Sequence, residues 1–141
     1  MKFFSLLLFF TSVNAFACPN LAGNYSCSDG NDTWNLLVTQ SVQNGATVYQ
    51  ETVGSTKNTY VADGVARPYT AQGEGYSIPG TLSTTCSGQT VTNHFLGKMQ
   101  GHPIDGTETI TMAGGKLKVQ TVATMNGEEV NSSQYECTPT N

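Results

Sequence analysis

The chain has 141 residues, enough for a single domain, and only 11% of them carry a charged side chain. Six Lys or Arg stand against ten Asp or Glu, which gives a formal net charge of −4 at pH 7. No basic cluster is present to neutralise a phosphate backbone, because the cations after residue 2 are only Lys57, Arg67, Lys98, Lys116 and Lys118. The composition therefore predicts no nucleic-acid partner.

Residues 1–17 have the pattern of a secretory signal peptide. Lys2 supplies a positive charge, an apolar run follows, and Ala15-Phe16-Ala17 matches an A-x-A cleavage site. The apolar run is far shorter than the roughly 20 residues needed to span a bilayer, and no later run replaces it. We therefore expect a secreted or periplasmic protein without a membrane span, in which residues 18–141 form one mature domain.

A second interpretation of this region is a bacterial lipoprotein acylated at Cys18, the residue directly after the cleavage site. Lipoprotein boxes have Leu three residues before the cysteine, whereas this chain has Ala15, and Phe16 is bulkier than the usual Ala or Ser. Acylation would also leave an odd number of cysteines for pairing. The non-lipidated form is the favoured interpretation.

The mature chain is predicted to consist of β-strands. No segment has apolar residues at helical spacing over three turns, and turns rich in Gly separate short runs of Thr, Val and Tyr. In chain order, strands are expected at 21–27, 34–41, 46–53, 58–62, 65–70, 81–86, 90–97, 107–112, 116–125 and 128–137. Hairpin signals lie between them at Asn44-Gly45, Asp63-Gly64, Gly114-Gly115 and Asn126-Gly127. Neighbouring strands should therefore be antiparallel and sequential.

One stretch, residues 71–80, is expected to be a mobile loop. It contains Gly73, Gly75 and Gly80 together with Pro79. A loop of this kind could act as a lid over a binding site.

Alternation of apolar and polar residues is clearest at 116–125, where Leu117 and Val119 share one face and Lys116 and Lys118 share the other. One face of each strand should be buried and the other wet. About eight to ten short strands fit either a sandwich or a closed barrel, and closure favours the barrel because it removes exposed edges. The predicted fold class is therefore an all-β antiparallel up-and-down meander closed into a barrel, with two disulfides.

The four cysteines should form those two disulfides, for which three pairings are available. If residues 19–27 form one strand, Cys18 and Cys27 lie about 30 Å apart, whereas bridged Cα atoms lie within roughly 7 Å. In an even-stranded meander the last strand runs antiparallel beside the first, which brings the end of one to the start of the other. These considerations favour Cys18 with Cys137 and Cys27 with Cys86. No Cys-x-x-Cys pattern suggests a metal site.

Residues suited to acid and base chemistry form no recognisable catalytic set. His94 falls in a predicted strand and His102 in the turn before Pro103, and no Ser or Cys nucleophile motif accompanies them. Glu128 and Glu129 are adjacent in a strand, so their side chains should point to opposite faces and be solvated. The sequence therefore predicts no enzyme activity, no cofactor and no metal.

The segment Leu21-Ala22-Gly23-Asn24-Tyr25 resembles the Gly-x-Trp signature in the first strand of lipocalins and related calycin barrels, with Tyr25 in place of the Trp. In that family the glycine and the aromatic residue close one end of the barrel. The resemblance implies a barrel that binds a small apolar or amphipathic ligand. The ligand-binding wall residues that it implies are Tyr25, Trp34, Phe95 and Leu117.

A second resemblance concerns the segment from Tyr25 to Gly30, which reads Tyr-Ser-Cys-Ser-Asp-Gly, together with the distant Cys137. This combination is similar to the periplasmic C-type lysozyme inhibitors, which are also small disulfide-bonded barrels and bind lysozyme through Ser-Gly-x-x-Tyr motifs. Here Ser87-Gly88 is followed by Gln, Thr and Val, without the tyrosine. The resemblance implies an extracellular or periplasmic protein-binding or inhibitor module.

Three classes of function therefore remain open. The favoured one is an exported barrel that binds a small apolar or amphipathic molecule, and the others are a protein-binding module and a structural exported protein. A cavity on the order of several hundred Å³ inside the barrel would support ligand binding, whereas a filled interior would support the other two.

Overall fold

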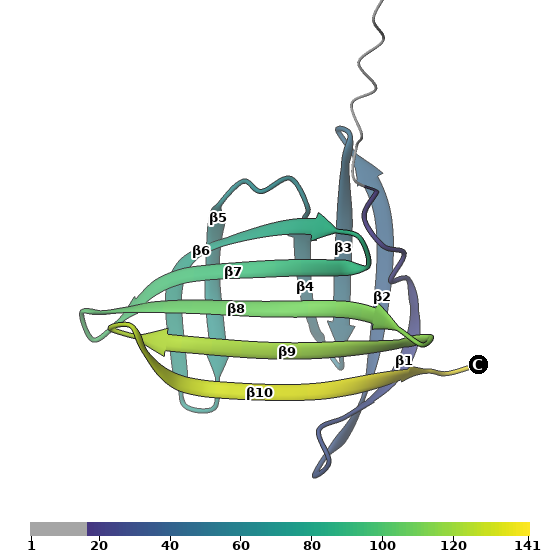
Figure 1. The fold of residues 1–141 in the computed structure, drawn as a ribbon. Coiled ribbons are helices and arrows are strands. Elements are labelled where there is room, and N and C mark those ends of the chain that lie inside the picture. The colour runs from purple at the N-terminus through teal and green to yellow at the C-terminus, as the bar shows by residue number, and fades with distance from the viewer. Residues whose placement is uncertain (1–16) are drawn as a thin grey trace, which may run out of the picture.

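The computed structural model describes residues 17–141, so the predicted signal peptide at 1–17 lies outside the described residues except for Ala17. The described chain forms ten β-strands joined by turns (Figure 1). They are β1 (Gly23–Ser28), β2 (Thr33–Gln43), β3 (Ala46–Val53), β4 (Thr56–Val61), β5 (Arg67–Gly73), β6 (Tyr76–Ser87), β7 (Thr90–Met99), β8 (His102–Ala113), β9 (Lys116–Met125) and β10 (Glu128–Pro139). Within residues 17–141 no helix is long and apolar enough to cross a membrane.

All ten strands belong to one antiparallel sheet in the order β4-β3-β2-β1-β10-β9-β8-β7-β6-β5. The last strand, β10, pairs with the first, β1, and consecutive hairpins extend the sheet on both sides of this pair. The sheet curls into a half-barrel (Figure 1) whose edge strands, β4 and β5, are not hydrogen-bonded neighbours. The predicted all-β antiparallel meander is confirmed, and the structure shows that its ring of hydrogen bonds stays open between these two strands.

Three of the four predicted hairpin signals lie in turns between paired strands. Both residues have positive φ at Asn44-Gly45, Gly114-Gly115 and Asn126-Gly127, a geometry whose twist matches that of the flanking strands. Gln100-Gly101 adopts the same conformation, with φ of 52° and 82°, although Gln is not a typical turn residue. The hairpin predicted at Asp63-Gly64 is wrong, because this pair lies in the longer connection between β4 and β5, the two edge strands, which are not paired with each other.

The expectation of a mobile loop at 71–80 is wrong, because β5 and β6 form a regular hairpin there. Two glycines of this region of the sheet serve close packing rather than mobility. A Cβ atom on Gly80 or on Gly97 would lie 2.7 Å from the ring of Phe95. Glycine at these two positions therefore leaves room for an aromatic side chain that packs close to the backbone.

Alternation places one face of each strand inside the half-barrel, as predicted. The main buried cluster consists of Leu21, Tyr25, Cys27, Leu36, Val38, Tyr49, Tyr60, Val91, Ile110, Leu117, Val119 and Cys137. A second, smaller cluster lies toward the hairpins β5–β6, β7–β8 and β9–β10 and consists of Ile78, Phe95 and Ile104. The interior therefore has one densely filled end and one sparsely filled end.

Two disulfides are present, as predicted, but the predicted pairing is wrong: Cys18 bonds Cys86, and Cys27 bonds Cys137. β1 is only six residues long, and its register with β10 places Cys27 directly opposite Cys137. Residues 18–22 form no strand, so Cys18 is free to reach the end of β6. Two disulfides are typical of proteins in an oxidising, extracytoplasmic compartment.

Candidate ligand-binding site

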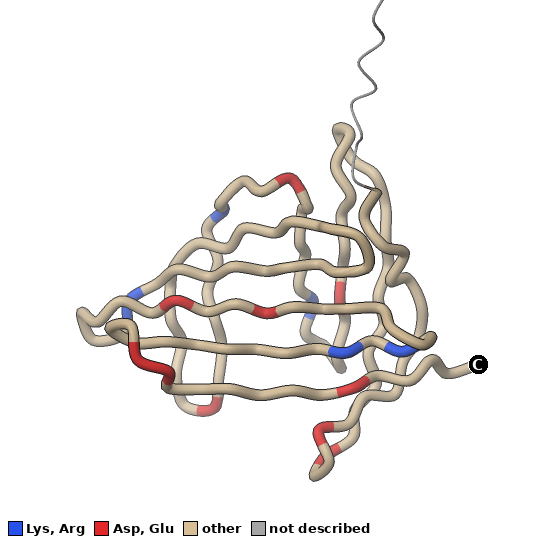
Figure 2. The backbone as a smooth tube through the Cα atoms, in the orientation of Figure 1, with Lys and Arg blue, Asp and Glu red and all other residues tan. Residues whose placement is uncertain are grey.

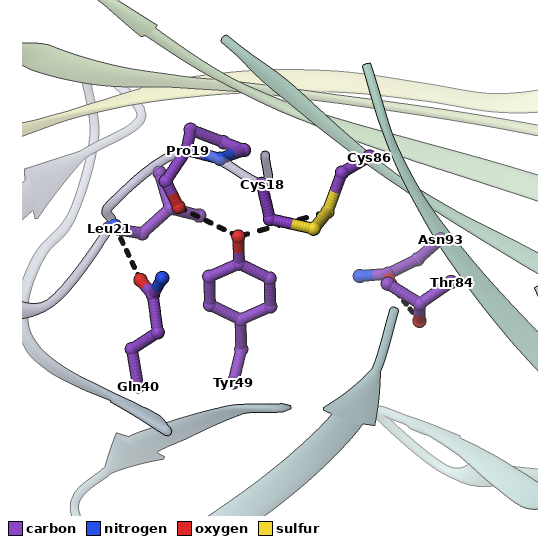
Figure 3. Close-up of a disulfide and its surroundings, with 8 residues drawn as sticks. All are labelled: Cys18, Pro19, Leu21, Gln40, Tyr49, Thr84, Cys86 and Asn93. Atoms are coloured by element: carbon purple, nitrogen blue, oxygen red, sulfur yellow. Dashed lines mark hydrogen bonds between the residues drawn. A yellow bond between two sulfur atoms is a disulfide. The ribbon is translucent and has the colours of Figure 1, made fainter. Parts of the chain in front are cut away.

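The segment before β1 packs beside Tyr49 and Cys86 (Figure 3), and its Leu21 belongs to the main buried cluster. The Cys18–Cys86 disulfide holds it there, with the two Cα atoms 5.2 Å apart. The Tyr49 hydroxyl donates a hydrogen bond of 2.7 Å to the carbonyl oxygen of Pro19. Burial raises the pKa of Tyr49 to about 12, so this hydroxyl remains a neutral donor at physiological pH. This end of the interior is filled by the chain itself.

The opposite end contains a cavity of about 280 Å³. Its apolar and aromatic walls include Tyr60, Tyr69, Ile78, Leu82, Phe95 and Ile104. Its polar lining includes Asn93, Thr107, Glu108 and Thr121. The volume lies near the lower end of the roughly 300–1,000 Å³ typical of ligand pockets, so the cavity suits a small molecule.

A larger hollow, of about 610 Å³, lies beside β1, β9 and β10. Polar side chains dominate its lining, among them Lys118, Gln120 and Gln134, and all three are exposed. Since ligand pockets bury most of a small molecule against apolar walls, the smaller interior cavity is the better candidate.

A series of hydrogen-bonded side chains on neighbouring strands ends at the cavity. Thr84 Oγ1 donates to Asn93 Oδ1 at 2.7 Å, and Asn93 Nδ2 donates to Glu108 Oε1 at 3.0 Å. Thr84 and Asn93 are 2% and 4% exposed, so neither can exchange these partners for bulk water. Because the Thr84 hydroxyl occupies the carbonyl side of the Asn93 amide, the amino group must point to Glu108. These two hydrogen bonds therefore fix the position of the Glu108 carboxyl group, which lines the cavity.

Glu108 shares the interior with a second carboxyl group, that of Glu51. Burial raises the pKa of both, and for Glu51 the negative charge of Glu108 adds to this effect and brings the pKa to about 7. The hydrogen bond from Asn93 opposes the shift at Glu108, and the Tyr60 hydroxyl opposes it at Glu51. The interior thus holds two carboxyl groups, of which Glu51 changes charge near neutral pH.

Three tyrosines surround these carboxyl groups. Burial, and next to it the negative charges of Glu51 and Glu108, raise the pKa of Tyr60, Tyr69 and Tyr135 above the ordinary value. Their phenols therefore stay protonated and supply hydrogen-bond donors and aromatic faces to the interior.

The residues predicted to contact a ligand are not gathered at this cavity. Phe95 lines it, whereas Leu117 lies in the main buried cluster. The Tyr25 hydroxyl donates to the carbonyl oxygen of Leu21 at 2.8 Å within the filled end. Trp34 packs edge-to-face on Tyr135, with ring centroids 5.0 Å apart.

Sequence reasoning missed Glu51 and Glu108, although the strand period contained a signal for both. Glu108 lies two residues before Ile110, and Glu51 lies two residues after Tyr49, so each shares the inward face of its strand. Charged residues are rarely buried, which is why such a position is easily assigned to the surface.

The two histidines lie at the surface. His94 Nε2 is 2.8 Å from Asp105 Oδ1, and His102 Nδ1 is 3.0 Å from Asn126 Nδ2. Within residues 17–141 no three His, Cys, Asp or Glu side chains come together as a metal-binding group.

Comparisons with known proteins show the fold alone. No family model and no curated protein matches this chain. Among solved structures, one described as "REP1-NXSQ fatty acid transporter" superposes with a TM-score of 0.54 over 86% of this chain and 96% of that chain, at 11% sequence identity. The two proteins therefore share a curled antiparallel β-sheet.

Proposed function

We propose that this chain binds a small apolar or amphipathic molecule in the interior cavity. The observation that carries the proposal is the asymmetry of the interior: one end is filled by the N-terminal segment, while the other retains about 280 Å³ between aromatic and aliphatic walls. Packed protein interiors rarely leave a space of this size without a ligand to fill it.

The structural comparison supports the same proposal. One solved structure that shares this fold is described as a fatty acid transporter. A fatty acid is an apolar chain with a polar end. The cavity described above has the matching composition, since apolar walls surround a few polar groups.

A ligand with a chain of eight carbons is a suitable probe for a cavity of this size. Burial of each methylene group contributes about 0.8 kcal/mol, so such a chain gains roughly 6 kcal/mol, from which the cost of association is subtracted. We therefore expect 1-octanol to bind with a dissociation constant on the order of micromolar to millimolar.

The test is calorimetric titration of the mature protein with 1-octanol. The variant Ala71→Phe places a ring in the cavity and should abolish binding, because Ala71 lines it. The control Thr70→Phe adds the same ring at the neighbouring exposed position and should bind as the wild type does. Equal binding by both variants, or none by the wild type, would overturn the proposal and favour a protein-binding module.

We also propose that residues 1–17 direct export and that the mature chain starts at Cys18. The disulfide supports the non-lipidated form, because it occupies the Cys18 sulfur that a lipid thioether would need. Mass spectrometry of the exported protein should give an unmodified N-terminal Cys18, and an added lipid mass would contradict this.

A further inference from the structure

We propose that the ligand of this cavity is an organic cation, an ammonium group on a small apolar body, and that Glu108 is its counter-charge. This inference rests on the proposed function, since it assigns a chemical class to the molecule in the same cavity. It follows from the placement of charge inside the half-barrel.

Glu108 is held in a position to receive a ligand. Its Oε1 accepts the 3.0 Å hydrogen bond from Asn93, and within residues 17–141 its Oε2 accepts no hydrogen bond from a side chain. The carboxyl group lines the cavity, so this second oxygen is available to a donor that enters it. No buried side-chain nitrogen or oxygen of residues 17–141 lacks a hydrogen-bond partner, so this oxygen is not sealed in the interior but faces accessible space, where an entering donor can reach it.

No positive charge of the described chain reaches the cavity. The five cations of residues 17–141 belong to β4, β5, β7 and β9 (Figure 2), and none of them lines the cavity. Four of them are exposed lysines: Lys57, Lys98, Lys116 and Lys118. Arg67 is bound at the surface by both carboxylate oxygens of Asp63, at 2.8 and 2.7 Å. An anionic ligand in the cavity would therefore meet the Glu108 carboxyl group and no cation.

The polar groups that surround the two carboxyls come from the neighbouring strands and are all neutral. They include Tyr60 of β4, Tyr69 of β5, Thr84 of β6, Asn93 of β7, Thr121 of β9 and Tyr135 of β10. Neutral donors stabilise a carboxylate only in part, whereas a cation at hydrogen-bonding distance compensates its full charge.

The aromatic walls favour the same class of ligand. Tyr60, Tyr69 and Phe95 line the cavity, and the Tyr69 and Phe95 rings pack edge-to-face with centroids 6.1 Å apart. The face of an aromatic ring carries partial negative charge and attracts ammonium groups within about 6 Å. Carboxylate and aromatic faces together form a site for a cation with an apolar body.

The affinity of this site for a cation should depend on pH, because protons and the cation compete for the same carboxyl groups. At neutral pH Glu51 is partly protonated, because its pKa is raised to about 7. A cation stabilises the ionised form of both carboxyls, so its binding should release protons and should weaken as the pH falls below 7. An anion would behave in the opposite way, since its binding is helped by protonation.

Three probes of equal length separate these cases: octylamine, 1-octanol and octanoate. At pH 7.5 we expect octylamine to bind about tenfold or more tightly than 1-octanol, and octanoate to bind most weakly. Octylamine affinity should fall at pH 5.5, and its heat of binding at pH 7 should differ between phosphate and Tris buffers in the direction of proton release.

The variant Glu108→Gln tests the assigned residue, because Gln keeps the shape and can still accept from Asn93. We expect it to lower the ratio of octylamine to 1-octanol affinity about tenfold. The control Glu129→Gln removes one exposed carboxyl and should leave this ratio unchanged. If 1-octanol binds but octylamine binds no more tightly, or if Glu108→Gln keeps the ratio, the cation is excluded while the proposed function stands. If none of the three probes binds, the proposed function itself fails.

Discussion

At the scale of single residues, Glu51 and Glu108 depart most from the usual rules of composition. A chain with only ten carboxylate residues places two of them inside its half-barrel, although solvation favours the surface. Positions that cost stability in this way are concentrated at functional sites. The two carboxyl groups therefore lower the stability of the folded protein, and they are also the main reactive groups of its interior.

Glu51 should make the stability of the protein depend on pH near neutrality. Its pKa is about 7 in the folded protein against 4.5 for an unshifted Glu, so the folded state binds more protons between these values. The free energy of unfolding should fall as the pH rises through this window, by about 3 kcal/mol at most. Glu51→Gln should reduce this fall, as measured by urea unfolding at pH 4.5, 6 and 7.5, and any fall that remains belongs to Glu108, whose pKa burial also raises.

The control for this measurement is Glu129→Gln, which should keep the wild-type pH profile because Glu129 is exposed. The surface carboxyls Asp29, Asp63 and Glu136 have lowered pKa values through hydrogen bonds, so they act with the opposite sign and only below pH 4.5. A stability that rises between pH 5 and 7 would contradict the assignment of Glu51.

At the scale of elements, the strands around the cavity depend on glycines that lie under one aromatic ring. Gly80 of β6 and Gly97 of β7 leave room for Phe95, and the ring in turn forms part of the cavity wall. Local sequence suggested a flexible lid because glycine is common in loops. In the paired strands, a glycine instead allows a neighbouring side chain to pack close to the backbone. This role depends on which residue lies on the adjacent strand, so the local sequence does not reveal it.

Gly97→Ala should disturb this arrangement. Its Cβ would lie 2.7 Å from the Phe95 ring and 2.9 Å from the Pro79 carbonyl oxygen, so the ring must move. We expect a loss of about 1–3 kcal/mol in the free energy of unfolding, together with weaker 1-octanol binding. Gly106→Ala is the matched control for stability, because its Cβ would meet Phe95 at an ordinary 3.8 Å. Equal stability of the two variants would show that the ring is free to move.

At the scale of the whole molecule, the two disulfides perform different tasks. Cys27–Cys137 joins β1 and β10, which are already hydrogen-bonded neighbours, and closes a separation of 110 residues. Cys18–Cys86 holds a segment without strand pairing against the end of β6. In the chain-entropy model both contribute on the order of 4–5 kcal/mol.

Removal of either disulfide should therefore lower global stability by a similar amount, but only one removal should open the filled end. In Cys18→Ser with Cys86→Ser, amide hydrogen exchange should accelerate at residues 18–22, because the tether that seats them is lost. In Cys27→Ser with Cys137→Ser, these residues should remain protected under native conditions. Equal protection of the segment in both variants would mean that the Tyr49–Pro19 hydrogen bond and apolar packing hold it without the tether.

The sequence by itself determined the parts of this protein that depend on local chemistry. A period of two along the strands, positive φ at Asn44-Gly45 and Asn126-Gly127, and an even number of cysteines predict an antiparallel, disulfide-bonded meander. Only the tertiary structure decided the disulfide pairing, the open edge between β4 and β5, and the gathering of Glu51 and Glu108 inside. Each of these depends on strand length and register across more than 50 residues of chain, and a shift of one residue in register reverses which face every side chain occupies.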